Sequence, residues 1–283
     1  MQKDLIELDL SDNAFGPAGA RPLMRLLVNN RNIRTLKLNN NGLGIEGGRL
    51  VSVALIEAHE KNQELGVADE LQVIIAGRNR MESPGVGHIA KALQLYSATL
   101  IRVQMPQNSI RPDGILVLMT ALASCTKLEH LDLQDNTFTE PGSLALANVC
   151  ANWPILRTLH VGDCLLSAKG GVHVIKALTS EHTKLENLHL GFNEINESGA
   201  MLVGPMLRNK SNLTRLELNG NVFLAESPSV DIIRQALENH GHPDALDELD
   251  EMESEDEEEE SDEEHEQEND SQVDELAGAI EKL

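Results

Sequence analysis

The segment Leu131–Phe138 reads LDLQDNTF, and the segment Leu8–Phe15 reads LDLSDNAF. Six of the eight positions are identical, although more than a hundred residues separate the two segments. Both fit the frame L-x-x-L-x-L-x-x-N, in which the alternating leucines predict a short strand with one buried face. A frame that returns in this way indicates a chain built from one structural unit used repeatedly.

The frame occurs eight times along the chain, with isoleucine, valine, methionine or alanine replacing some of the leucines. Its last position is occupied by Asn13, Asn41, Asn79, Asn108, Asn136, Cys164, Asn193 and Asn221, so the steps are 28, 38, 29, 28, 28, 29 and 28 residues. Leucine-rich repeats have about 20–29 residues each. The step of 38 therefore contains one repeat plus an insertion, which we place at residues 57–70.

Each strand is followed by a loop and then by a stretch with helical spacing, for example residues 87–96 and 143–153. Strands that alternate with helices stack in parallel, and the helices cover one side of the sheet. The sequence thus predicts an α/β leucine-rich-repeat solenoid, a horseshoe of about eight strand–helix repeats with the strands inside, over residues 1–243.

The asparagine at the end of each frame has a predicted structural role. A carboxamide both donates and accepts hydrogen bonds, so at a buried turn it can satisfy backbone groups that no strand reaches. We expect an asparagine ladder, with Cys164 as a replacement in one position, made of Asn13, Asn41, Asn79, Asn108, Asn136, Asn193 and Asn221.

The charge of the chain is concentrated at one end. The formal net charge of the 283 residues is −23, and residues 244–283 contain 21 acids and one lysine, which is −20. The remaining −3 comes from 25 acids against 22 lysines and arginines in residues 1–243. We expect a largely disordered acidic tail over residues 244–283, which either solvates the chain or attracts a basic partner.

The sequence contains none of the common catalytic or phosphate-binding motifs, and its ten histidines are scattered along the chain. Three cysteines give neither a disulfide framework nor metal-ligand spacing. No signal peptide and no membrane-spanning apolar run is recognisable. We therefore expect a protein of a reducing compartment that offers a long surface to another macromolecule.

Some segments are more specific than the general repeat frame. They are Glu7–Pro17 (ELDLSDNAFGP), Leu36–Gly44 (LKLNNNGLG), Ala76–Glu82 (AGRNRME), Met105–Ile110 (MPQNSI), Leu131–Gly142 (LDLQDNTFTEPG) and Glu217–Asn221 (ELNGN). With the acidic tail behind them, they make the chain resemble the Ran GTPase-activating proteins, whose repeats are of the ribonuclease-inhibitor-like class. The resemblance covers nearly the whole chain.

The resemblance implies a regulator of a reaction that another protein performs, not an enzyme. The family stimulates GTP hydrolysis by the small GTPase Ran and thereby supports nucleocytoplasmic transport. It uses no arginine finger, and an asparagine helps to hold the catalytic glutamine of Ran, which positions the attacking water. Asn40, in LNNNG, matches that asparagine. A carboxamide suits this role because it can donate to and accept from a glutamine amide.

Further loop residues match the family at the same rim. Arg78, Arg80 and Asp135 are implied contacts for Ran. Weaker candidates occupy the position of Asp135 in their own repeats, and two basic loop residues are expected to face solvent without such a role. The weaker candidates are Asp12, Gln107 and Asp163, and the two basic residues are Arg111 and Lys169.

The chain also departs from the family pattern. It begins almost inside a repeat, whereas family members have further repeats upstream, including a loop with an important arginine. We therefore expect a chain that lacks its N-terminal repeats and activates Ran less well. The alternative is a non-catalytic leucine-rich-repeat scaffold or inhibitor that only binds, and such a protein would tolerate any polar residue at position 40.

The resemblance also implies the partners. Ran in its GTP form is the expected partner, together with a Ran-binding protein, and the chain itself is expected to be a monomer in the cytoplasm or at the nuclear envelope. It needs no metal or other cofactor of its own, because GTP and Mg²⁺ belong to Ran. Neither nucleic acid nor a membrane is an expected partner.

Overall fold

The computed structural model describes residues 5–30 and 32–253, in which eight strands alternate with eight helices. The strands are β1 (Glu7–Asp9), β2 (Thr35–Lys37), β3 (Val73–Ile75), β4 (Arg102–Gln104), β5 (His130–Asp132), β6 (Thr158–His160), β7 (Asn187–His189) and β8 (Arg215–Glu217). The helices are α1 (Gly16–Asn29), α2 (Gly44–Glu64), α3 (Glu82–Leu95), α4 (Pro112–Leu122), α5 (Thr139–Cys150), α6 (Ser167–Leu178), α7 (Glu197–Leu207) and α8 (Pro228–Asn239).

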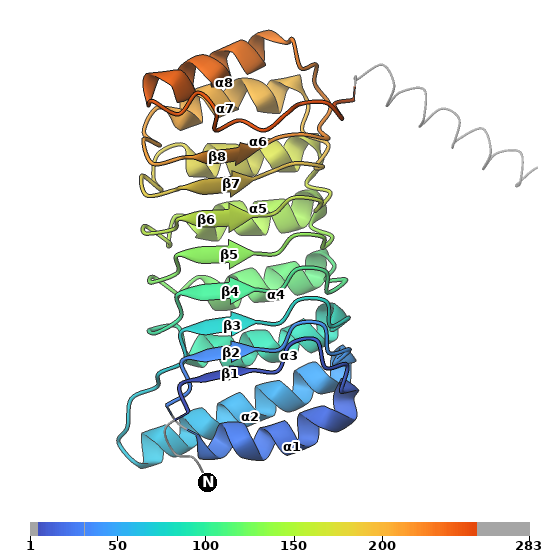
Figure 1. The fold of residues 1–283 in the computed structure, drawn as a ribbon, viewed down its shortest axis with the longest axis vertical. Coiled ribbons are helices and arrows are strands. Elements are labelled where there is room, and N and C mark those ends of the chain that lie inside the picture. Colours follow the sequence, from blue (N-terminus) through green and yellow to red (C-terminus); the bar gives the residue numbers. More distant parts are fainter. Residues whose placement is uncertain (1–4, 31, 254–283) are drawn as a thin grey trace, which may run out of the picture.

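The strands form one parallel sheet in which β1 to β8 follow one another in chain order. Each helix from α1 to α7 returns the chain to the start of the next strand, and the helices lie along one face of the sheet (Figure 1). The register pairs equivalent residues, as in Leu131 with Leu159 and Leu159 with Leu188. The predicted α/β leucine-rich-repeat solenoid is confirmed.

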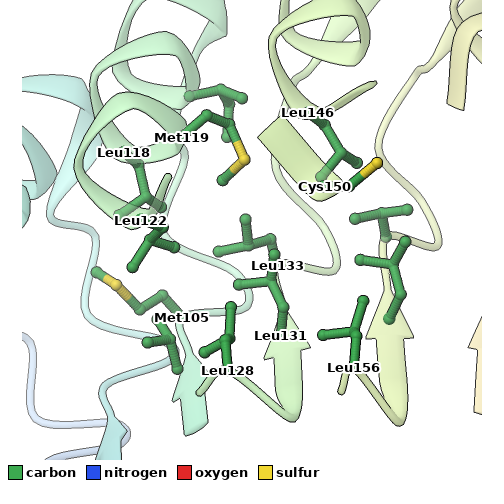
Figure 2. Packing of buried hydrophobic residues seen from close by; sticks show 14 of the residues in the cluster. Met105, Leu118, Met119, Leu122, Leu128, Leu131, Leu133, Leu146, Cys150 and Leu156 are labelled. Carbon is green, nitrogen blue, oxygen red and sulfur yellow. The ribbon is translucent and has the colours of Figure 1, made fainter. Parts of the chain in front are cut away.

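The core lies between the sheet and the helices. The middle residue of each strand from β2 to β8 is fully buried, whereas its two neighbours are less buried and face the opposite side, which we call the open face of the sheet. Figure 2 shows leucines of two adjacent repeats, among them Leu131 and Leu156, packed toward Leu118, Leu122 and other residues of the helices. Leu8, the middle residue of β1, is only partly buried, because β1 is the edge strand and no strand precedes it within the described residues.

The insertion predicted at residues 57–70 occupies the end of α2 and the loop that follows it. Helix α2 has 21 residues, against 11 to 14 in the other helices. Near its end, Asp69 accepts a hydrogen bond from Asn62 Nδ2 at 2.9 Å and lies 2.6 Å from His59 Nδ1. The extra residues thus lengthen a helix and its loop without changing the register of β2 and β3.

The ladder positions connect neighbouring repeats through buried hydrogen bonds. Asn79 Nδ2 donates to the carbonyls of Leu38, Ala76 and Gly77 at 2.9, 3.1 and 2.9 Å, and its Oδ1 accepts from Asn41 N at 3.0 Å. The same pattern recurs at the buried Asn41, Asn108, Asn136 and Asn193. Asn221 differs in that its Nδ2 donates to two carbonyls, those of Leu190 and Leu218. Cys164 takes this position with Sγ 3.3 Å from the carbonyls of Leu133 and Gly162.

The last part of the described chain corrects the predicted domain boundary. Composition places residues 244–253 in the acidic tail, whereas Leu246 forms a parallel bridge with Leu216 of β8. The Asp247 carboxylate accepts from Leu218 N at 3.0 Å and from Asn219 N at 3.1 Å. This acidic segment therefore covers the edge of β8, and its Asp247 carboxylate serves as an acceptor for backbone N–H groups. Its acidic composition alone gives no sign of this role. Residues 254–283 lie outside the described residues.

The contacts of Asp247 lead to a testable prediction. Replacing Asp247 by alanine should lower the free energy of unfolding by about 2 kcal/mol, because two backbone N–H groups lose a charged acceptor. Burial raises the pKa of this carboxyl, and the N–H groups of Leu218 and Asn219 oppose the rise. Urea denaturation would measure the loss. Glu248→Ala, at an exposed neighbouring position, is the matched control, and an equal effect of both changes would contradict the assignment.

Candidate functional site

The candidate site lies in the loops that follow the carboxyl ends of β2 to β6, which we call the rim. In each of these loops the residue before the ladder position has a left-handed backbone. The φ values are 51° for Asn40, 54° for Arg78, and 53° for Gln107, Asp135 and Asp163. Asparagine and aspartate adopt this conformation more readily than other residues with a side chain.

Backbone hydrogen bonds hold these left-handed residues in place. Asn40 N donates to Gly77 O at 2.9 Å, Arg78 N to Pro106 O at 2.9 Å, and Asp135 N to Gly162 O at 3.1 Å. Each acceptor belongs to the next repeat, so each loop is fixed by its neighbour. The ladder side chain points into the protein and the residue before it carries its side chain on the outside, as predicted for Asn40, which is exposed.

A groove of about 580 Å³ runs along the rim. It brings together Asn40, Arg78, Arg80 and Asp135, the four residues for which the sequence predicts a functional role. They come from the loops after β2, β3 and β5. The remaining lining residues are Gln107, Ser109, Arg111, Asn136, Thr137, Asp163 and Leu165.

The carboxamide of Asn40 uses its nitrogen in a hydrogen bond, whereas its oxygen is available to a partner. Its Nδ2 donates to Asp12 Oδ1 at 2.9 Å. Its Oδ1 accepts no hydrogen bond from residues 5–30 and 32–253. Asp12 does not line the groove but orients the side chain that does. The geometry leaves an acceptor at a fixed point of the rim, on a backbone that its neighbours hold.

The charges of the groove are mixed, with three arginines and two aspartates along its walls. Arg78 Nε donates to Gln107 Oε1, so this arginine is held by the next repeat. The Arg80 guanidinium makes no ion pair or hydrogen bond with the described residues. An exposed guanidinium with unused donors suits a partner that presents carboxylate or phosphate oxygens.

The groove contains one basic residue, Arg111, for which the sequence predicts no functional role. Arg111 lines the groove, whereas Lys169 does not. The backbone N–H of Arg111 donates to Ser83 Oγ at 3.1 Å, and the same hydroxyl donates to Asp113 at 2.7 Å, which holds the pKa of Asp113 below its usual range. The signal that could have found Arg111 was its place in the same loop as Gln107, one of the weaker candidates.

Another hollow, of about 490 Å³, lies between α7 and α8 on the helix side. None of the predicted site residues lines it, and its walls combine residues such as Pro205 and Ile232 with a few polar side chains. We therefore assign the candidate site to the rim groove, where charged and amide side chains from successive repeats converge. No helix within the described part of the chain is long and apolar enough to cross a membrane.

The fold and the rim define a leucine-rich-repeat protein. The family model described as Leucine Rich repeat matches residues 3–24, 29–52, 124–147 and 181–204. Among curated proteins, Ran GTPase-activating protein 1 of Saccharomyces cerevisiae is 35% identical over 240 residues, which cover 82% of this chain and 58% of the yeast protein. The Ran GTPase-activating protein of Drosophila melanogaster is 36% identical over 221 residues, 77% of this chain and 37% of its own.

A third relative, Ran GTPase-activating protein 1 of Xenopus laevis, is 48% identical over 108 residues, 38% of this chain and 18% of the frog protein. The chain belongs to the leucine-rich-repeat family of the Ran GTPase-activating proteins. It spans less than two thirds of the length of each of these relatives.

Proposed function

We propose that this protein stimulates GTP hydrolysis by the small GTPase Ran. Two findings support the proposal: the curated relatives carry this activity in their names, and the rim groove unites Asn40 with Arg78, Arg80 and Asp135. The second observation is the one that carries it. The protein then acts in the cytoplasm as a regulator whose partner is Ran in its GTP form, and it supports nucleocytoplasmic transport.

In the proposed mechanism Asn40 acts on Ran, not on the nucleotide. Its Oδ1, which has no partner within the described residues, accepts a hydrogen bond from the side-chain amide of the catalytic glutamine of Ran. That glutamine orients the attacking water. Positioning is most of what a protein contributes to phosphoryl transfer, because the nucleotide and its Mg²⁺ supply the reacting groups.

The arginines of the groove have a different role in this proposal. Arg80 and Arg111 bind acidic groups on the surface of Ran and so strengthen the complex without acting on the glutamine. Neither acts as an arginine finger, a device that contributes about 10³–10⁵ to the rate. Loss of Asn40 should therefore lower the rate of hydrolysis, whereas loss of an arginine should raise KM.

Replacing Arg80 by alanine should therefore raise KM for Ran–GTP roughly tenfold and leave kcat within a factor of about two, because a docking contact stabilises ground state and transition state equally. The effect should shrink at high salt, since exposed charges are screened there. Steady-state kinetics at two salt concentrations would measure both. Lys169→Ala, outside the groove, is the control. A fall in kcat of roughly 1000-fold would instead identify an arginine finger.

The experiment that tests the proposed function is single-turnover hydrolysis of Ran-bound GTP with and without the full chain. Acceleration that saturates with protein concentration supports an activator. Saturable binding of Ran–GTP without acceleration supports the alternative, a leucine-rich-repeat scaffold or inhibitor. Absence of binding removes Ran as the partner of the chain.

A further inference from the structure

A row of ionisable side chains crosses the open face of the sheet near its C-terminal end. The third residues of β5, β6, β7 and β8 are Asp132, His160, His189 and Glu217, and the parallel register sets them side by side. Two histidines between two carboxylates on a rigid sheet form a cluster separate from the rim groove, whose lining includes none of the four.

Three of these side chains lie close together. One ligand atom each from His160, His189 and Glu217 lies within 4.8 Å of the other two. The imidazole rings of His160 and His189 have centroids 4.2 Å apart. Ligands that share one tetrahedral Zn²⁺ at about 2.0–2.1 Å lie roughly 3.3 Å from each other, so small side-chain rotations would complete the geometry.

The contact between His189 and Glu217 is short but is not an aligned hydrogen bond. Nδ1 of His189 lies 2.7 Å from Glu217 Oε2, yet this buried nitrogen has no hydrogen-bond partner of acceptable angle within the described residues. His189 is only 9% exposed. The hydrogen-bonding capacity of this nitrogen is therefore unused, and a cation bound between His189 and Glu217 would use it.

We propose that His160, His189 and Glu217 bind a divalent transition metal ion, with Zn²⁺ as the best match. Two imidazoles and one carboxylate are a ligand set that Zn²⁺ accepts with water in the fourth position, whereas Mg²⁺ and Ca²⁺ prefer oxygen ligands alone. Asp132 Oδ1 lies 3.7 Å from His160 Nδ1 and can orient this ring as its other nitrogen binds the metal.

The site would have two consequences for the molecule. Its ligands come from three successive strands, so the ion links β6, β7 and β8 on the face that the helices do not cover. Its fourth position faces the open side of the sheet, where a ligand from a bound protein can replace the water. Neither consequence depends on Ran, and the proposal stands apart from the proposed function.

The test is a Co²⁺ titration of the full chain in excess Mg²⁺, which occupies the many carboxylates, with the visible Co²⁺ absorption as the readout. Competition by Zn²⁺ for the bound Co²⁺ gives the Zn²⁺ affinity. We expect one tight equivalent that His160→Gln and His189→Gln each weaken at least roughly 100-fold, since loss of an orienting outer residue alone costs about 10–100-fold. Asp132→Asn should weaken it roughly tenfold.

His173→Gln is the matched control, because His173 also lies beside a carboxylate, 4.0 Å from Glu140, but has no second histidine. It should leave the spectrum and affinity unchanged. The proposal is overturned if the wild-type chain binds no tight equivalent, or if both glutamine variants keep it. Circular dichroism of the metal-free variants verifies folding, and His160, which is less buried than His189, is informative even if His189→Gln unfolds.

Discussion

Alanine in place of Asn40 is expected to lower the single-turnover rate of GTP hydrolysis on Ran by roughly 100-fold, the usual effect of removing one hydrogen-bonding group that acts in the transition state. Affinity for Ran–GTP should stay within a factor of about three, because the change removes one exposed side chain from a large interface. The free energy of unfolding should hardly change, since Asn40 is exposed and, within the described residues, its side chain bonds only to exposed Asp12.

The isosteric change Asn40→Asp sharpens this test. An aspartate keeps the shape and the oxygen acceptor of Asn40 but loses the amide donor, and it adds a charge 2.9 Å from where the Asp12 carboxylate now lies. Repulsion between the two carboxylates should turn the side chain away and lower the rate as well. Ser109→Ala, at an exposed groove position, is the control. An Asn40→Ala chain with an unchanged maximal rate would exclude the proposed mechanism.

Replacing Asn79 by alanine is expected to lower the free energy of unfolding by about 3–5 kcal/mol, because several buried backbone groups lose their hydrogen-bond partner at once. Its side chain donates to the carbonyls of Leu38, Ala76 and Gly77, and its oxygen accepts from Asn41 N. Water cannot replace these bonds, since Asn79 is fully buried. Urea denaturation monitored by circular dichroism would measure the loss.

Asn13→Ala is the matched control for this ladder prediction. Asn13 holds the same frame position but is exposed, and among the described residues its Nδ2 donates only to Leu10 O and Ser11 O. Its loss should cost less than about 1 kcal/mol, as is usual for surface substitutions. Equal losses for Asn79→Ala and Asn13→Ala would show that burial of the ladder does not determine its contribution to stability.

Strict periodicity explains how much of this molecule the sequence predicts. A frame of fixed length that returns eight times determines strand order, parallel pairing and the position of every rim loop. Asn40, Arg78, Arg80 and Asp135 could therefore be placed at one edge of the sheet, where the structure finds them in one groove. Their roles toward Ran came from the family resemblance and stay predictions.

Two features could not be predicted from the overall composition, because they depend on where individual residues lie within the repeat. Residues 245–253 follow no leucine frame and are strongly acidic, so nothing in their pattern revealed that they pair with β8. His160, His189 and Glu217 looked scattered when histidines were considered as a group. Counted within the frame, they occupy one position at steps of 29 and 28 residues, which is the signal that brings them together on the sheet.

The left-handed residue before each ladder position has a consequence for how such a surface can evolve. Asp12, Asn40, Arg78, Gln107, Asp135, Asp163 and Phe192 share one backbone conformation despite unrelated side chains. The neighbouring repeat holds that conformation through backbone hydrogen bonds, so the fold does not require one particular side chain at this position. This one position of the repeat supplies Asn40, Arg78, Gln107, Asp135 and Asp163 to the groove, and substitutions there can change what the surface recognises while the scaffold stays the same.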